Sequence, residues 1–150
     1  MKAFNRLYYF LTFTWGIITN ILGALVALFF VAFGQASVSM YAGRFLVSSY
    51  FLSSGCSLGN FIFAPKSCSE DLLNHEVGHS LQNIFWGPLF LIVIGIPSFI
   101  RCQYFICYRS LRNRFNNLQP LPDYDAIWFE GQATRWGTSY IQAFNSIKNN

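Results

Sequence analysis

The sequence contains few charged residues. Asp, Glu, Lys and Arg make up 11% of its 150 residues, against about 25% in an average soluble domain. Hydrophobic residues account for 53% and aromatic residues for 19%, a composition typical of a membrane protein. The net charge of +4 does not indicate nucleic-acid binding, because the basic residues lie beside apolar segments and no nucleic-acid motif is present.

Several common motifs are also missing. None of the four cysteines has C-x-x-C spacing, which argues against a zinc ribbon. We find no internal repeat, low-complexity tract or glycine-rich phosphate loop. Cys56 and Cys68 fall in a segment expected on the outer side of the membrane, where they can form a disulfide or remain free thiols. Cys102 and Cys107 are expected on the inner side, where thiols stay reduced.

The N-terminal third contains a long apolar segment. Residues 7–33 carry no charge, and this run exceeds the ~20 residues needed to cross a bilayer, so it predicts a transmembrane helix with some tilt. A signal peptide is the alternative, since Lys2 and Arg6 provide a basic start. The apolar run is longer than the ~7–15 residues of a signal-peptide core, which favours a retained anchor.

Residues 44–64 have the composition of β-strands. Aromatic and β-branched residues flank a Ser53-Ser54-Gly55-Cys56 break, which predicts a β-hairpin. Arg44 argues against a further membrane span. The second strand of this hairpin, 57–64, precedes the most distinctive motif of the chain, so it is placed either to bind an extended peptide by edge addition or to pack over the site.

The only two histidines of the chain lie in one motif, His75-Glu76-Val77-Gly78-His79. On a helix, residues four apart project from the same face, so His75 and His79 can bind one metal ion. Glu76 projects near that face, where its carboxylate can accept a proton from water. Neutral imidazoles suit Zn²⁺, which lowers the pKa of bound water towards ~7.

This H-E-x-x-H pattern resembles that of the zincin metallopeptidases. The resemblance covers the motif and its flanks, about a fifth of the chain. It implies zinc held by His75 and His79, with Glu76 as the general base. Acidic residues Glu70 and Asp71 after a serine predict the start of the motif helix.

A second apolar segment, 84–100, follows the motif. With the motif helix leading into it, segment 70–100 predicts a metal-binding helix that continues into a second membrane helix, kinked or broken at Pro88 and Pro97. A basic cluster follows, typical of a cytoplasmic flank: Arg101, Arg109, Arg112 and Arg114. These flanks predict two spans with both termini cytoplasmic and the metal site near the outer side or within the bilayer.

The third ligand is predicted from the same resemblance. In gluzincins it is a glutamate on a later helix, and Glu130, within the expected helix 124–145, lies in an apolar context where an unpaired carboxylate would be costly. Pairing with Arg135 is the alternative. Gluzincins often carry an acid four residues after this glutamate, and here that residue is Thr134. Asp123 or Asp125 could support the site or replace Glu130 as ligand.

A conflict accompanies this prediction, because a full crossing by residues 84–100 would leave Glu130 across the bilayer from the histidines. Either the motif lies within the membrane, or the 84–100 segment turns at Gly87-Pro88 or near Pro97, or the 124–145 helix enters the bilayer. We favour a motif partly within the membrane, packed against the 124–145 helix.

The sequence therefore predicts a single mainly α-helical membrane domain over residues 1–150, with two or three membrane-associated helices and a small hairpin before the metal helix. The expected function is that of an integral-membrane zinc metallopeptidase acting on peptide or membrane-protein substrates. Arg135, Tyr124 and Tyr140 are candidates for stabilising the oxyanion. The alternative is a non-catalytic zinc-binding membrane subunit or interaction protein. Self-association or a place in a larger membrane complex is compatible with the apolar faces.

Overall fold

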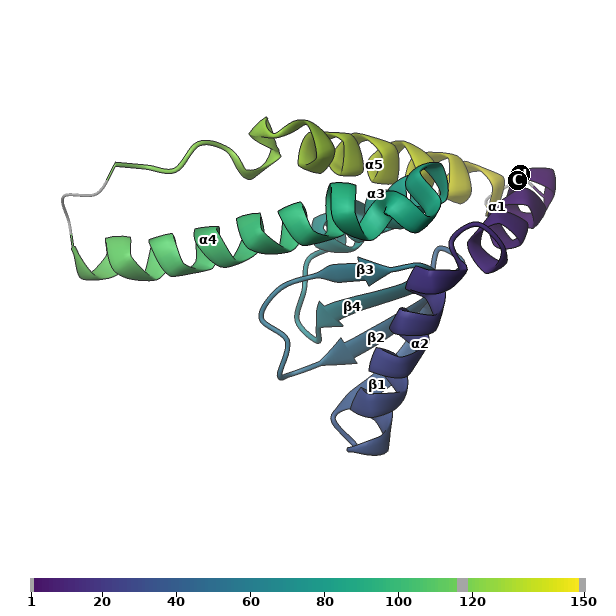
Figure 1. The fold of residues 1–150 in the computed structure, drawn as a ribbon, viewed down its shortest axis with the longest axis horizontal. Coiled ribbons are helices and arrows are strands. Elements are labelled where there is room, and N and C mark those ends of the chain that lie inside the picture. The colour runs from purple at the N-terminus through teal and green to yellow at the C-terminus, as the bar shows by residue number, and fades with distance from the viewer. Residues whose placement is uncertain (1, 116–118, 149–150) are drawn as a thin grey trace.

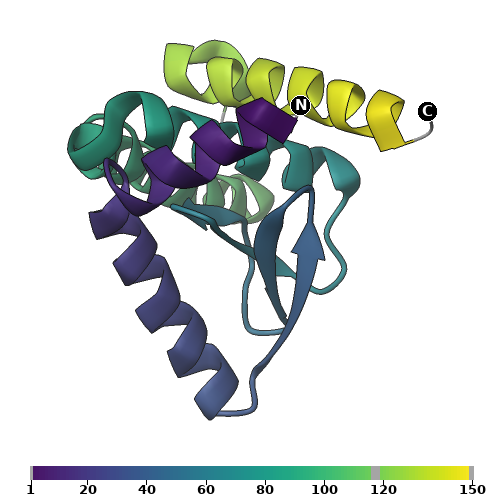
Figure 2. The ribbon, with the colours of Figure 1, turned by 90° about the vertical axis from the view of Figure 1, so that its right-hand side faces the viewer.

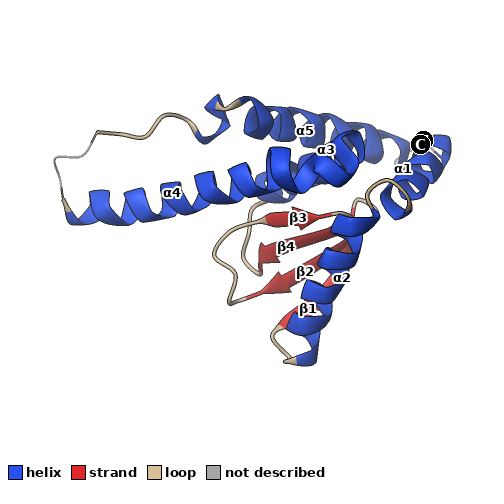
Figure 3. Ribbon diagram, viewed as in Figure 1, coloured by secondary structure: helices blue, strands red, loops and turns tan. Residues whose placement is uncertain are grey.

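A computed structural model of the chain describes residues 2–115 and 119–148. It is mostly helical, with one small mixed sheet (Figures 1 and 3). The elements are α1 (Lys2–Phe13), α2 (Ile17–Ala32), β1 (Ala36–Tyr41), β2 (Arg44–Ser49), β3 (Cys56–Leu58), β4 (Phe61–Pro65), α3 (Glu70–Trp86), 3₁₀ helix η1 (Gly87–Leu89), π-helical η2 (Leu91–Gly95), α4 (Ile96–Arg114), 3₁₀ helix η3 (Tyr124–Ala126) and α5 (Trp128–Lys148).

The predicted single helix over 7–33 is wrong, because α1 and α2 are separate helices that meet at an angle of 85°. Polar side chains near the bend bind other parts of the fold: the Thr19 hydroxyl donates to Asn83 Oδ1 on α3 (2.6 Å), and Asn20 Oδ1 accepts from the backbone N–H of Asn60 (3.0 Å). A Cβ at Gly16 would lie 2.7 Å from the Asn83 amide nitrogen, so a larger residue at the bend would displace this side chain. Hydropathy registers the apolar residues but not this change of direction.

The predicted hairpin over 44–64 is also wrong in its pairing. The sheet order is β1-β2-β4-β3, and β2 and β4, the two segments expected to form the hairpin, run parallel. The antiparallel hairpins are β1–β2, with its turn at Ala42-Gly43, and β3–β4, with its turn at Gly59-Asn60. Positive φ angles at Ala42, Gly43 and Gly59 suit such two-residue turns. Residues 50–55 form the connection that lets the chain reverse before β3.

The sheet separates two apolar layers, as the alternation along β4 requires. Ile62 and Ala64 pack against Leu73 and Val77 of α3, whereas Phe63 faces α2. Figure 2 shows α2 on one side of the sheet and the α3–α5 pair on the other. This arrangement fixes the motif helix between the sheet and α5.

The motif helix ends sharply and does not continue into the next apolar segment. Gly87 has a φ of +52°, which favours glycine, and Pro88 follows. The chain then passes through η1 and η2 into α4, which extends away from the sheet, and residues 119–124 lead back to α5 (Figure 1). The break expected at Pro88 within the 70–100 unit is therefore present, whereas Pro97 lies in the first turn of α4, which extends through the basic cluster to Arg114.

One helix in the described part of the chain, Leu91–Arg114, is long and apolar enough to span a membrane; the only other candidate is the bent α1–α2 pair. Of the two or three membrane helices expected, a single straight one therefore meets the criteria of length and composition. The helix over 124–145 is present as α5, which packs directly along α3.

Candidate metal centre and its cleft

Two glycines allow α3 and α5 to come into backbone contact. A Cβ at Gly78 would lie 2.7 Å from Ala133 Cα and closer still to its carbonyl group. A Cβ at Gly137 would lie 2.7 Å from the Asn74 carbonyl carbon. Carbon atoms normally approach only to about 3.5–4.0 Å, so no larger residue fits at either position. The close crossing brings one face of α5 onto the face of α3 that carries the histidines.

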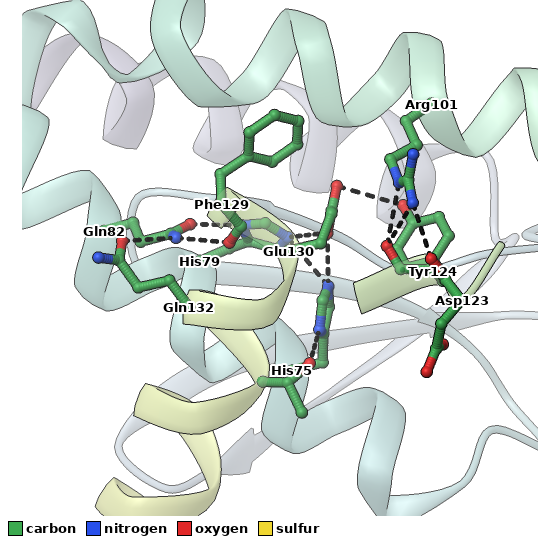
Figure 4. A network of polar contacts seen from close by, with 10 residues as sticks. His75, His79, Gln82, Arg101, Asp123, Tyr124, Phe129, Glu130 and Gln132 are labelled. Atoms are coloured by element: carbon green, nitrogen blue, oxygen red, sulfur yellow. Dashed lines mark hydrogen bonds and ion pairs between the residues drawn. The ribbon is translucent and has the colours of Figure 1, made fainter. Parts of the chain in front are cut away.

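Three potential ligand atoms converge at this crossing. Glu130 Oε2 lies 3.0 Å from His75 Nε2 and 3.2 Å from His79 Nε2, and the two imidazole nitrogens are 3.0 Å apart (Figure 4). In a tetrahedral zinc site with bonds of about 2.0–2.1 Å, neighbouring ligand atoms are about 3.3 Å apart. The three atoms therefore match the spacing of one coordination sphere, and the group His75, His79 and Glu130 could hold a metal ion.

The tautomer of His79 is set by a glutamine that the sequence prediction missed. The Gln82 amide nitrogen donates to the Phe129 carbonyl (2.7 Å) and to Gln132 Oε1 (3.0 Å), so Gln82 Oε1 faces His79 Nδ1, 2.8 Å away (Figure 4). A carbonyl oxygen only accepts, so His79 Nδ1 carries a proton and Nε2 is the nitrogen that faces Glu130. Gln82 lies three residues after His79, on the same helix face, which is a signal that the sequence does contain.

His75 is held in a similar way from α5. Its Nδ1 lies 2.8 Å from the Thr134 hydroxyl, which can accept a hydrogen bond from it. Thr134 occupies the position where the resemblance led us to expect an acid. A hydroxyl here supports the same orientation of the ring, with Nε2 directed at Glu130. Each histidine thus has one nitrogen bound by a supporting residue and the other directed at the shared point, the usual arrangement around a metal.

The charge state of Glu130 is consistent with a ligand. Burial would raise the pKa of its carboxyl group, but hydrogen bonds with His75 and His79 outweigh burial and hold this pKa well below its usual range. The side chain is fully buried. With two imidazoles at 3.0–3.2 Å, the buried Glu130 carboxyl group is held in its ionised form. This is the form that binds a metal ion.

Glu76 lies beside the three candidate ligands but does not point its carboxylate into the same hydrogen-bonded cluster. It is 4% exposed, and its Oε2 atom has no hydrogen-bond partner among the described residues. A Cβ at Gly55 would overlap its carboxylate, so the loop before β3 closes over it only because residue 55 is a glycine. Burial raises the pKa of Glu76, although the neighbouring histidines oppose this shift.

These residues open onto a cavity of about 480 Å³, which we call the β3–α4 cleft. One wall is the loop 51–55 and strand β3, the floor carries His75, Glu76 and His79, and the opposite wall comes from residues 90–103. Tyr124 also lines the cleft. Its hydroxyl donates to Glu130 Oε1 (3.3 Å), and Arg101 holds its backbone by donating to the carbonyls of Asp123 and Tyr124 at 2.8–3.0 Å (Figure 4).

The other predicted site residues lie elsewhere. Arg135 is exposed on α5 and does not line the cleft. The Tyr140 ring lies 4.2 Å from the buried Arg44 guanidinium group. It packs against the apolar core between the sheet and α3. Of the three candidates for oxyanion stabilisation, the structure brings Tyr124 alone to the cleft. Asp123 and Asp125 lie outside the ligand group.

Cys56 and Cys68 do not form a disulfide, one of the two states that the sequence left open for them. Cys56 and Cys68 are both free thiols, as are Cys102 and Cys107. Cys56 and Cys102 instead line the β3–α4 cleft from its two opposite walls.

Comparison with protein-family models, with curated protein sequences and with solved structures found no match to this chain.

Proposed function

We propose that this protein is a membrane-associated zinc metallopeptidase. The observation that carries the proposal is the convergence of His75, His79 and Glu130 on one point, with the buried Glu76 carboxylate beside them at the floor of an open cleft. Two imidazoles and one carboxylate form a three-ligand set that suits zinc and leaves a fourth position for substrate or water. The same geometry supports the resemblance of the motif to zincins.

When bound, zinc would supply Lewis-acid chemistry that activates water and polarises a carbonyl group. The residues of the chain perform the proton transfers. Glu76 accepts the proton of the attacking water on a carboxylate oxygen and delivers it to the amine released when the peptide bond breaks. Its lack of a competing hydrogen bond at Oε2 leaves that atom available for this role. A pKa raised by burial makes it a stronger base than an exposed glutamate.

Tyr124 is the proposed stabiliser of the oxyanion. Tyr124 lines the cleft, and its phenol hydroxyl, which donates to Glu130 Oε1, would turn this donation to the carbonyl oxygen of the substrate. Arg101 fixes the backbone of this tyrosine through three hydrogen bonds. A donor held in place before the reaction stabilises developing negative charge at little reorganisation cost.

Membrane association is proposed from the surface of α2 and α4. Large apolar side chains with more than half of their surface exposed project from both helices, among them Ile18, Ile21, Leu25, Leu28, Phe29, Phe99, Ile100 and Tyr104. Extensive exposed apolar surface is rare on soluble monomers. The Leu91–Arg114 helix is long enough to enter or cross a bilayer. The wall of the cleft that this helix forms would then lie close to the lipid.

The test is metal analysis and peptide cleavage by the purified protein and its Glu76→Gln variant in detergent micelles. We expect one zinc per chain in both proteins, loss of zinc in His75→Ala, and cleavage by the parent only. The glutamine side chain has nearly the size of glutamate but cannot accept the proton of water. Cleavage by Glu76→Gln would refute its role as the base. Zinc without cleavage by the parent would favour a non-catalytic zinc-binding subunit.

A further inference from the structure

A second cavity, of about 290 Å³, lies between the C-terminal half of α4 and the segment that returns to α5. We call it the α4 pocket; it is lined by four α4 residues between Phe105 and Arg112 and by residues 121–124. None of the candidate metal ligands lines it. Arg109 and Arg112 are three residues apart, so their side chains leave α4 from the same face. The pocket therefore offers two guanidinium groups to one ligand.

Hydrogen bonds attach the return segment to α4 at two places. The Tyr108 hydroxyl donates to the Gln119 carbonyl (2.8 Å), ahead of the lining residues 121–124. Arg101 donates to the carbonyls of Asp123 and Tyr124 at 2.8–3.0 Å, at the end of this stretch. The two walls of the pocket are thus connected on either side of residues 121 and 122, so the protein itself holds them together.

The α4 pocket carries more positive than negative charge. Asp123 is the one acidic residue among its lining residues, against Arg109 and Arg112. In the described part of the chain neither arginine forms an ion pair with a carboxylate. Arg109 instead lies 5.9 Å from the Phe105 ring. Because arginine presents a planar set of N–H donors that matches two oxygens of a phosphate group, the pocket suits a phosphate-bearing ligand.

The place of the pocket on α4 favours a lipid as the source of that phosphate. Large apolar side chains are exposed in the turns before it, among them Phe99, Ile100 and Tyr104. The helix that carries them, Leu91–Arg114, is the straight candidate for a membrane span. Arginines that follow an apolar helical segment lie at the level of the lipid headgroups when the helix enters a bilayer. A lipid at this level would meet both the arginines and the apolar face.

Resting on the proposed membrane association but not on the peptidase activity, we propose that the α4 pocket binds the phosphate group of an anionic lipid. Arg109 and Arg112 donate to the phosphate oxygens. Phe105 and Leu121, which also line the pocket, contact the apolar atoms next to the headgroup. The Asp123 carboxylate opposes binding, since it repels the phosphate. The site fastens the far end of α4 to the membrane surface.

The test is native mass spectrometry of the full chain released from uncharged detergent micelles that contain phosphatidylglycerol, phosphatidylcholine or inorganic phosphate. We expect one phosphatidylglycerol per chain, bound about tenfold more tightly than either of the other two, because each arginine near a headgroup adds to the attraction for net negative charge. Equal binding of phosphatidylcholine would overturn the charge argument. Equal binding of inorganic phosphate would show that the ligand is not a lipid.

Arg109→Gln and Arg112→Gln should each weaken phosphatidylglycerol binding about fivefold. Arg114→Gln is the matched control, because Arg114 is exposed on the same helix, carries the same charge and does not line the pocket. Its affinity should stay parental. A loss in Arg114→Gln as large as in Arg112→Gln would mean that the lipid responds to the overall charge of the helix, and would overturn the site.

Asp123→Asn provides a result that misfolding cannot produce. Removing the one carboxylate of the pocket should tighten phosphatidylglycerol binding, and the gain should shrink at high ionic strength, where charge interactions are screened. The Asp123 backbone carbonyl that accepts from Arg101 is retained. Asp125→Asn is its matched control, because Asp125 does not line the pocket. An equal gain in both variants, or no gain in Asp123→Asn, would contradict the proposal.

The outcome is separable from that of the proposed peptidase. Selective phosphatidylglycerol binding by a protein that holds no zinc and cleaves no peptide would sustain the lipid site and remove the peptidase. Zinc-dependent cleavage by a parent that does not distinguish the lipids would do the reverse.

Discussion

Gly78→Ala tests whether the close contact of α3 and α5 creates the metal centre. The added Cβ would lie 2.7 Å from Ala133 Cα, whereas carbon atoms need about 3.5–4.0 Å. The helices must therefore separate locally by about 1 Å. Glu130 lies one turn from Ala133 on α5, while both histidines remain on α3. A metal–oxygen bond of about 2.0–2.2 Å stretched by that amount no longer holds the ion.

We expect the metal affinity of Gly78→Ala to fall at least 100-fold, about 2.7 kcal/mol. Overpacking should also lower the free energy of unfolding by about 1–3 kcal/mol. Competition with a chromophoric chelator measures affinity, and circular dichroism confirms that the variant remains folded during the titration. His75, Glu76 and His79 are unchanged, so any loss comes from helix separation.

Gly95→Ala is the matched control for this experiment. Its added Cβ would meet its nearest neighbour, Leu91 Cδ2, at 3.5 Å, an ordinary contact. We expect its affinity for zinc to match that of the parent. Parental affinity in folded Gly78→Ala would show that Glu130 is not held in place by the helix crossing, and would refute the reasoning.

Three further variants test the parts of the site separately. Gln82→Leu removes the acceptor that fixes the tautomer of the second histidine; zinc affinity should fall about 10–100-fold, and an unchanged affinity in the chelator assay would contradict that role. Gly55→Ala should displace the Glu76 carboxylate, so kcat should fall while zinc content measured by mass spectrometry stays at one per chain; a parental kcat would count against the placement of Glu76. Tyr124→Phe should lower kcat about 10²–10³-fold with zinc retained, and a change confined to KM would assign the hydroxyl to substrate binding.

The residues of the centre were predictable because their signal is local or chemical. The four-residue spacing of His75 and His79 places both rings on one face of any helix. Glu130 was predicted from the resemblance to gluzincins together with its apolar context, and the structure brings it to the histidines. The α-helix expected over 124–145 is present as α5, since its apolar residues recur at helical spacing.

The pairing of strands and the directions of helices could not be read in the same way. A parallel β2–β4 contact depends on where the chain goes between the strands, which no short pattern encodes. The 85° bend between α1 and α2 depends on contacts of Thr19 and Asn20 with residues 40 and more positions away. Tyr140 was proposed for chemistry from its residue type alone, and only the fold shows it stacked on Arg44.

Between α3 and α5 the chain makes a long detour through η1, η2 and α4, and this detour provides none of the three metal-binding atoms. It supplies one wall of the cleft, and its Arg101 is hydrogen-bonded to the backbone at the return point. The candidate metal-binding atoms and the apolar wall therefore reside on different portions of one small polypeptide. Substitutions along that wall, at residues such as Leu91, would change the lining of the cleft and leave His75, His79 and Glu130 in place.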